Sequence, residues 1–185
     1  MKKKLLLWIL LLGWMAVIFL FSAQDAEASS SLSSGFLHRF ILIFLPEQAA
    51  GNEELVHTLG FLIRKAAHMT EYAILAILAF AQLRQYFPAY VSKKQDWQPG
   101  SCRHHPFFQF LLTICFIFLY ACTDEFHQRF IDGRSGQFTD VCIDTLGGLC
   151  GCLLFLLCSR LLRRMSKNRL VLIWKHMVKF LSEQL

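Results

Sequence analysis

Apolar residues run in four long stretches along the chain, and more polar segments separate them. A transmembrane helix needs about 20 mostly apolar residues and tolerates somewhat fewer. On this criterion the pattern predicts transmembrane helices at about residues 5–22, 59–83, 107–123 and 140–158. The sequence therefore predicts an all-α membrane protein with four transmembrane helices.

Two further segments have a helical pattern of their own. Phe36 to Leu45 is an apolar stretch in the first loop that ends at Pro46, which predicts an interfacial or re-entrant segment. Residues 159–185 place apolar side chains near one helical face and contain seven Lys or Arg against one Glu. They predict a basic amphipathic helix, with a merely solubilising tail as the alternative. We therefore expect a transmembrane domain at 1–158 and a cytoplasmic tail at 159–185.

The composition supports a membrane location. Hydrophobic residues make up 55% of the chain and charged residues only 17%, with a mean hydropathy of +0.43. These values are too apolar for a soluble domain of this length.

A cleaved signal peptide is the alternative interpretation of the first span. Lys2, Lys3 and Lys4 precede the apolar run, and Ala26-Glu27-Ala28 imitates a cleavage site. However, the run from Leu5 to Ser22 is longer than a usual signal core and contains two Trp. We expect this span to be retained as a membrane anchor.

The distribution of Lys and Arg predicts the orientation, because short cytoplasmic loops carry an excess of these residues. The N-terminal lysines, the loop after the second span and the tail hold most of them, whereas acidic residues collect in the other loops. We expect a multi-pass protein of the cell membrane with cytoplasmic N- and C-termini. Anionic lipid headgroups are the expected partner of the tail, and a nucleic acid partner is not expected.

Ionisable residues at the edges of the apolar spans are the main functional clue. A charge at the centre of a membrane helix costs about 2.5–3.5 kcal/mol, so such residues usually have a function. Three groups occur: Arg64-Lys65-x-x-His68-x-x-Glu71-Tyr72, Asp124-Glu125-x-His127-Gln128, and Arg134 with Asp140 and Asp144. On the predicted orientation all three meet at the extracytoplasmic leaflet.

Helical spacing places the members of each group on a shared face. The first group lies on one face of the second span, and Asp124, His127 and Gln128 align if the third helix continues through them. Asp140 and Asp144 are four residues apart, and their face continues through small residues at Gly147, Gly148 and Gly151. A stripe of small residues lets another helix approach closely, which would bring the acids against the other groups.

These residues together resemble the VanZ-like family of bacterial membrane proteins over roughly residues 5–158. The resemblance rests on Ser22-Ala23-Gln24, on Arg64-Lys65-Ala66-Ala67-His68 with Glu71-Tyr72, on Asp124 to Gln128, and on Arg134, Asp140, Asp144 and Gly148. It implies four transmembrane helices. The family takes its name from an accessory protein that raises resistance to the glycopeptide teicoplanin, so the resemblance also implies a possible link to antibiotic resistance.

Three hypotheses explain the polar residues. In the first, they bind or move an anionic lipid-linked or cell-envelope ligand, since polar groups facing a membrane cavity mark binding sites and pathways. In the second, the protein is a membrane-embedded hydrolase or transferase, in which His titrates near neutral pH and can act as acid or base. In the third, the charges form a purely structural buried ion network.

Each hypothesis assigns roles to the same side chains. The candidates for ligand binding are Arg64, Lys65, Gln128 and Arg134, and a guanidinium suits phosphate or carboxylate. If the protein is an enzyme, the candidate catalytic residues are His68, Glu71, Asp124, Glu125, His127, Asp140 and Asp144. The acids with a His could also hold a divalent metal, although no recognised ligand spacing supports this.

Overall fold

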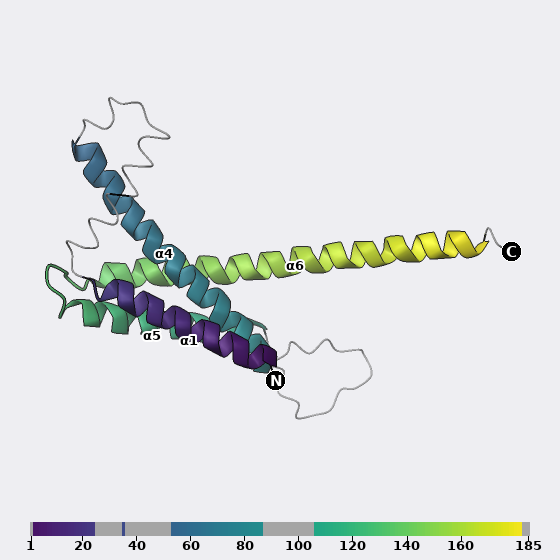
Figure 1. The fold of residues 1–185 in the computed structure, drawn as a ribbon, viewed down its shortest axis with the longest axis horizontal. Helices are drawn as coiled ribbons and strands as arrows, with labels where there is room; N and C mark the ends of the chain where they lie inside the picture. Colours follow the sequence, from purple (N-terminus) through teal and green to yellow (C-terminus); the bar gives the residue numbers. More distant parts are fainter. Residues whose placement is uncertain (1, 25–34, 36–52, 87–105, 183–185) are drawn as a thin grey trace. The chain divides into compact units, whose positions relative to one another are not determined.

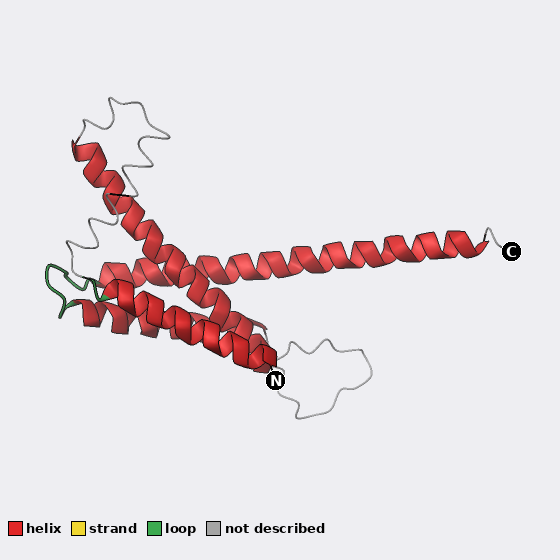
Figure 2. Ribbon diagram, in the orientation of Figure 1, coloured by secondary structure: helices red, strands yellow, loops and turns green. Residues whose placement is uncertain are grey.

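Four long helices make up the regular structure of the residues that are described, 2–24, 35, 53–86 and 106–182. In this computed structural model they are α1 (Lys2–Ser22), α4 (Glu53–Tyr86), α5 (Pro106–Gln128) and α6 (Phe138–Ser182). Figure 1 labels the four helices, and Figure 2 shows that a short loop joins α5 to α6. Each helix contains a stretch long and apolar enough to cross a membrane. The predicted fold class is confirmed.

The helix ends differ from the predicted spans where polar residues continue a helix beyond its apolar part. α4 begins at Glu53 rather than at residue 59, and α5 continues through Gln128. α6 extends to Ser182 without a break, because residues 152–182 contain no Gly or Pro and are rich in helix-forming Leu, Arg and Lys. The predicted interfacial segment at 36–45 lies outside the described residues.

The chain divides into two compact units, Met1–Cys152 and Leu153–Leu185. The second unit is the continuation of α6, and its Arg160, Arg163 and Arg164 are exposed. The predicted domain boundary at residue 158 stays a prediction. The first unit, called here the bundle, contains the candidate site.

Side-chain contacts of α1 define the topology of the bundle. Trp8 Nε1 donates a hydrogen bond of 2.9 Å to the Tyr86 hydroxyl, and Trp14 Nε1 donates one of 2.9 Å to the Glu71 carbonyl, so α1 and α4 run antiparallel. The Tyr120 hydroxyl donates to the Met15 carbonyl at 2.7 Å. Further along both helices Phe19 packs on His127, so α1 and α5 run in the same direction. These contacts make α1 part of the bundle, which favours its retention.

Glycines on α6 let its backbone touch α4 and α5. A Cβ at Gly147 would lie 2.4 Å from the Met69 carbonyl oxygen, and one at Gly151 would lie 2.2 Å from that of Ala73. A Cβ at Gly148 would meet Ile117 at 2.7 Å. The prediction that this small-residue stripe allows close helix approach is confirmed.

The turn between α5 and α6 also depends on glycine. Gly133 has a φ of 72°, in the left-handed region that favours glycine. A Cβ at Gly136 would lie 2.1 Å from the Glu125 carbonyl oxygen. The turn therefore packs directly against the end of α5, beside the acidic residues.

Candidate functional site

The ionisable residues gather at one end of the bundle, called here the polar end. α1 finishes there at Ser22, α5 finishes at Gln128, and α6 begins at Phe138. The ammonium group of Lys65 on α4 forms an ion pair with Asp140 of α6. This part of α4 therefore also lies at the polar end. The three sequence groups thus meet in space, as helical spacing predicted.

The pair between Lys65 and Asp140 ties α4 to the start of α6. The side chains are 22% and 23% exposed, so the pair is largely shielded from solvent. The ammonium also lies 5.3 Å from the centre of the Phe61 ring, a distance that permits a cation–π interaction. Arg64, one residue earlier, is half-buried.

Three buried carboxylates form the centre of the polar end, and we call them the carboxylate cluster. Asp124 is 4% exposed, Glu125 is 5% exposed and Asp144 is 1% exposed. One oxygen from each lies within 4.8 Å of the others. Among the described residues these three could hold a metal ion, whereas Asp140 instead pairs with Lys65.

Protein donors orient two of the three carboxylates. Gln128 Nε2 donates to Asp124 Oδ2 at 3.3 Å, and the Gln137 backbone N–H donates to Glu125 Oε2 at 2.9 Å. By contrast, neither carboxylate oxygen of Asp144 has a hydrogen-bond partner within the described ranges. Buried polar groups nearly always have partners, so this orphan requires an explanation.

The two histidines lie in different surroundings. His68 Nδ1 is 3.9 Å from Glu71 Oε2, too far for a hydrogen bond but close enough for an electrostatic interaction. His127 stacks on Phe19 with 4.5 Å between ring centres. His68 and Glu71 thus form a neighbouring pair on α4, whereas His127 faces α1.

Arg134 supplies positive charge beside these residues. Its Nη2 donates to the Phe21 carbonyl at 3.4 Å, so the turn after α5 is held over the end of α1. Its charge acts on Glu71, His68 and Asp124. The guanidinium thus lies among candidate residues from two helices.

Sequence reasoning named Tyr72 and Ser22 in its motifs but gave neither a role at the polar end. Tyr72 is fully buried and its hydroxyl has no hydrogen-bond partner among the described residues, while Ser22 is 1% exposed and lies beside Asp124 without a hydrogen bond of ordinary geometry. Tyr72 lies four residues after His68, on the same helical face. In the sequence, this spacing indicated that Tyr72 lies at the site, whereas the indication for Ser22 was its position in the Ser22-Ala23-Gln24 motif.

A cleft opens beside Glu125 at the polar end. It has a volume of about 250 Å³. Its walls come from α5, the following turn and the start of α6, and they include Cys122, Phe126, Arg129, Gly136, Gln137, Phe138 and Val141. The cleft gives the edge of the carboxylate cluster room for a ligand.

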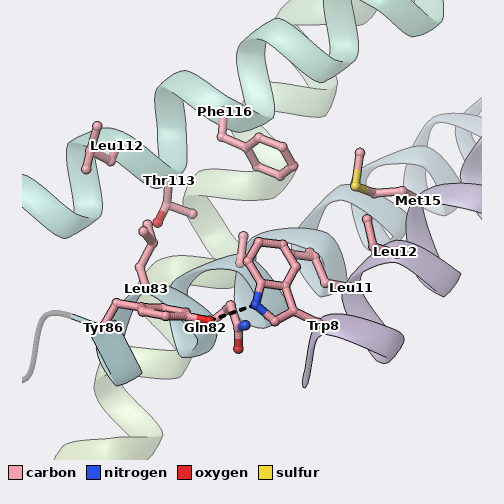
Figure 3. Close-up of a pocket in the computed structure, with 11 residues that line it drawn as sticks. Trp8, Leu11, Leu12, Met15, Gln82, Leu83, Tyr86, Leu112, Thr113 and Phe116 are labelled. Carbon is pink, nitrogen blue, oxygen red and sulfur yellow. Dashed lines mark hydrogen bonds between the residues drawn. The ribbon is translucent and has the colours of Figure 1, made fainter. Parts of the chain in front are cut away.

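The opposite end of the bundle contains a mostly apolar cavity. This cavity is larger, at about 420 Å³, and lies between α1, α4 and α5, and Figure 3 shows the residues that line it. Its walls are mostly apolar, with Trp8, Leu12, Met15, Leu112 and Phe116 around it. The chemistry-bearing residues are thus concentrated at the polar end.

The helices define an all-helical, multi-pass membrane protein, and its ionisable groups gather at one end of the bundle. Residues 7–159 match the VanZ/LLP1 family, and the chain belongs to that family. The match confirms the resemblance seen in the sequence motifs. No curated protein and no solved structure matches the chain.

Proposed function

We propose that this protein binds or moves an anionic lipid-linked or cell-envelope ligand at the polar end of the bundle. Lys65 and Arg134 supply positive charge at this end, and the cleft beside Glu125, which Arg129 lines, gives room for a ligand. A guanidinium recognises phosphate or carboxylate through paired hydrogen bonds, which makes Arg134 the principal ligand-binding residue.

The observation that carries this proposal is the meeting of cations, acids and a cleft at one end of a membrane bundle. A purely structural ion network would pair its buried charges, because an unpaired charge in a low-dielectric interior is costly. Asp144 is buried and has no partner in the described part of the chain. A site that takes up a ligand from outside the chain explains Asp144 better than a closed network does.

We further propose that the polar end faces the extracytoplasmic leaflet. Lys4 and Arg84 belong to the opposite end of the bundle, where Lys4 lies 4.8 Å from the centre of the Tyr86 ring. The positive-inside rule assigns that end to the cytoplasm. Both termini are then cytoplasmic, and the exposed Arg160, Arg163 and Arg164 of the tail meet anionic lipid headgroups.

A membrane-embedded hydrolase or transferase is the second candidate, and the pair of His68 and Glu71 favours it. A carboxylate 3.9 Å from an imidazole nitrogen can orient and polarise a general base. The substrate would be a lipid or phosphorylated envelope compound at the same polar end.

The test is to incubate the purified full-length protein with a bacterial lipid extract and to identify bound and changed lipids by mass spectrometry. The proposal predicts saturable binding of anionic lipids that Arg134→Gln weakens at least tenfold. Arg160→Gln is the matched control, because it removes an exposed guanidinium from the tail.

The possible outcomes separate the candidates. Unchanged lipids with Arg134-dependent binding support the binding function, and new products that His68→Ala abolishes support the enzyme. Binding that only Arg160→Gln weakens would assign the lipids to the tail and refute the proposal for the polar end.

A further inference from the structure

We propose that the carboxylate cluster of Asp124, Glu125 and Asp144 is a binding site for one divalent cation of the Mg²⁺, Mn²⁺ and Ca²⁺ type. The site joins α5 to α6 within the bundle. This inference does not depend on the envelope ligand, because the cation is held by the protein's own oxygens.

The spacing of the oxygens fits a single ion. Ligand oxygens lie about 2.0–2.1 Å from Mg²⁺ and about 2.3–2.6 Å from Ca²⁺, so two oxygens on opposite sides of one ion are about 4–5 Å apart. One oxygen from each carboxylate lies within 4.8 Å of the other two. Hard divalent cations prefer carboxylate oxygens, which makes them the chemical class that this set selects.

Two buried groups at the cluster have no hydrogen-bond partner among the described residues. They indicate a ligand, and this observation is separate from the presence of three acids. Asp144 is 1% exposed, and neither of its oxygens has a hydrogen bond within the described ranges. The Tyr72 hydroxyl is fully buried and also has no partner there, and its electrostatic neighbours include Asp124, Asp144 and Glu125. A bound cation would satisfy the Asp144 oxygens directly.

The charge balance of the cluster also calls for a cation. The charged groups that act most strongly on Asp144 are Glu125, Asp124, Asp140 and Glu71, all of them acids. The nearby ammonium of Lys65 is engaged by Asp140, and the guanidinium of Arg134 acts on Asp124 and on Glu71 outside the cluster. Buried carboxylates in contact require a counter-charge or protons, and a divalent cation neutralises two of the three charges at once.

The surroundings of the cluster resemble the outer shell of a metal site. Gln128 and the Gln137 backbone N–H each hold one oxygen of a cluster carboxylate. Such outer hydrogen bonds fix the orientation of ligating groups, and their loss typically lowers metal affinity about 10- to 100-fold. The turn containing Gly136 brings the Gln137 donor into place.

The direct test is a Mn²⁺ titration of the full-length protein, purified in detergent and stripped with a chelator, followed by electron paramagnetic resonance. We expect one saturable Mn²⁺ per chain, competed by Mg²⁺ or Ca²⁺. Asp144→Asn should weaken binding at least about tenfold, since losing a ligand costs no less than losing an outer-shell partner. Asp132→Asn is the control, because Asp132 is exposed in the turn and outside the cluster.

A thermal unfolding experiment on the same samples gives an independent readout. In chelator, Asp144→Asn should unfold at a higher temperature than the wild type, because it removes a buried carboxylate without a partner. Mn²⁺ should raise the unfolding temperature of the wild type and of Asp132→Asn but not that of Asp144→Asn. If Asp144→Asn does not fold, Glu125→Gln replaces it in both experiments.

Two results would overturn the proposal. One is the absence of saturable Mn²⁺ binding near one ion per chain, which would mean that the carboxylates are neutralised by protons. The other is an equal Mn²⁺ affinity in the wild type, Asp132→Asn and Asp144→Asn, which would place the ion elsewhere on the protein.

Discussion

Replacing Gly151 by Ala tests the helix contact that brings the start of α6 to the polar end. The added Cβ would lie 2.2 Å from the Ala73 carbonyl oxygen, compared with 3.4–4 Å for an ordinary contact. The obstructing atom belongs to the backbone of α4 and cannot rotate away. The two helices must therefore separate by roughly 1 Å at this point, which weakens the dispersion contacts on both sides.

The magnitude follows from two opposing effects. Overpacking a tight contact costs about 1–3 kcal/mol, and the upper part of this range applies when a backbone atom is in the way. Alanine favours a helix over glycine by about 1 kcal/mol. The net loss in free energy of unfolding is therefore about 2 kcal/mol, or about 30-fold in the folding equilibrium.

Gly13→Ala in α1 is the matched control, because a Cβ there meets nothing within 4 Å. It should leave the stability unchanged or raise it by up to about 1 kcal/mol. Both variants can be compared by reversible unfolding of the purified protein in mixed micelles, with tryptophan fluorescence as the signal. If Gly151→Ala is as stable as Gly13→Ala, the close contact between α4 and α6 is wrong.

Three further predictions concern single side chains. Tyr120→Phe removes the donor to the Met15 carbonyl and should cost about 1 kcal/mol of unfolding free energy, measured in the same mixed micelles; no change would show that α1 and α5 are not joined there. His68→Ala, Asp124→Ala and Arg134→Ala should each remove lipid binding or turnover while membrane insertion persists, and loss of the variants from isolated membranes would instead favour a structural network. A single cysteine at Asp132 should react with an impermeant thiol reagent added outside cells, and labelling only from the cytoplasm would reverse the proposed orientation.

The hydropathy pattern predicted the positions of the four membrane helices because burial in lipid requires long apolar runs. The sequence also predicted a helix in the tail, but it did not indicate that α6 continues into the tail without a break or that α4 begins at Glu53. Polar residues with good helix propensity continue a helix beyond its apolar part without an apolar signal. The glycine contacts of α6 were predictable because a stripe of small residues has few other structural uses.

The contents of the site were predictable only in part. Spacing indicated that Asp124, His127 and Gln128 share a face, and Gln128 does donate a hydrogen bond to Asp124. It did not indicate that His127 stacks on Phe19 or that Glu125 joins Asp124 and Asp144. These choices depend on which helices pack on either side of α5, and helical periodicity alone does not contain that information. The burial of Tyr72 likewise depends on the neighbouring helices.

The meeting of sequence-distant acids at one end of the bundle underlies every proposal for this protein. It can be measured by crosslinking two engineered cysteines, Asp124→Cys and Asp144→Cys, with a short bifunctional thiol reagent in membranes, in a chain without its native cysteines. The control pairs Asp124→Cys with Cys152, kept in that variant as the single native cysteine, which lies about 12 Å further along α6 than Asp144. Rapid crosslinking of the first pair and none of the second is the predicted result. Equal crosslinking of both pairs, or none of either, would contradict the carboxylate cluster.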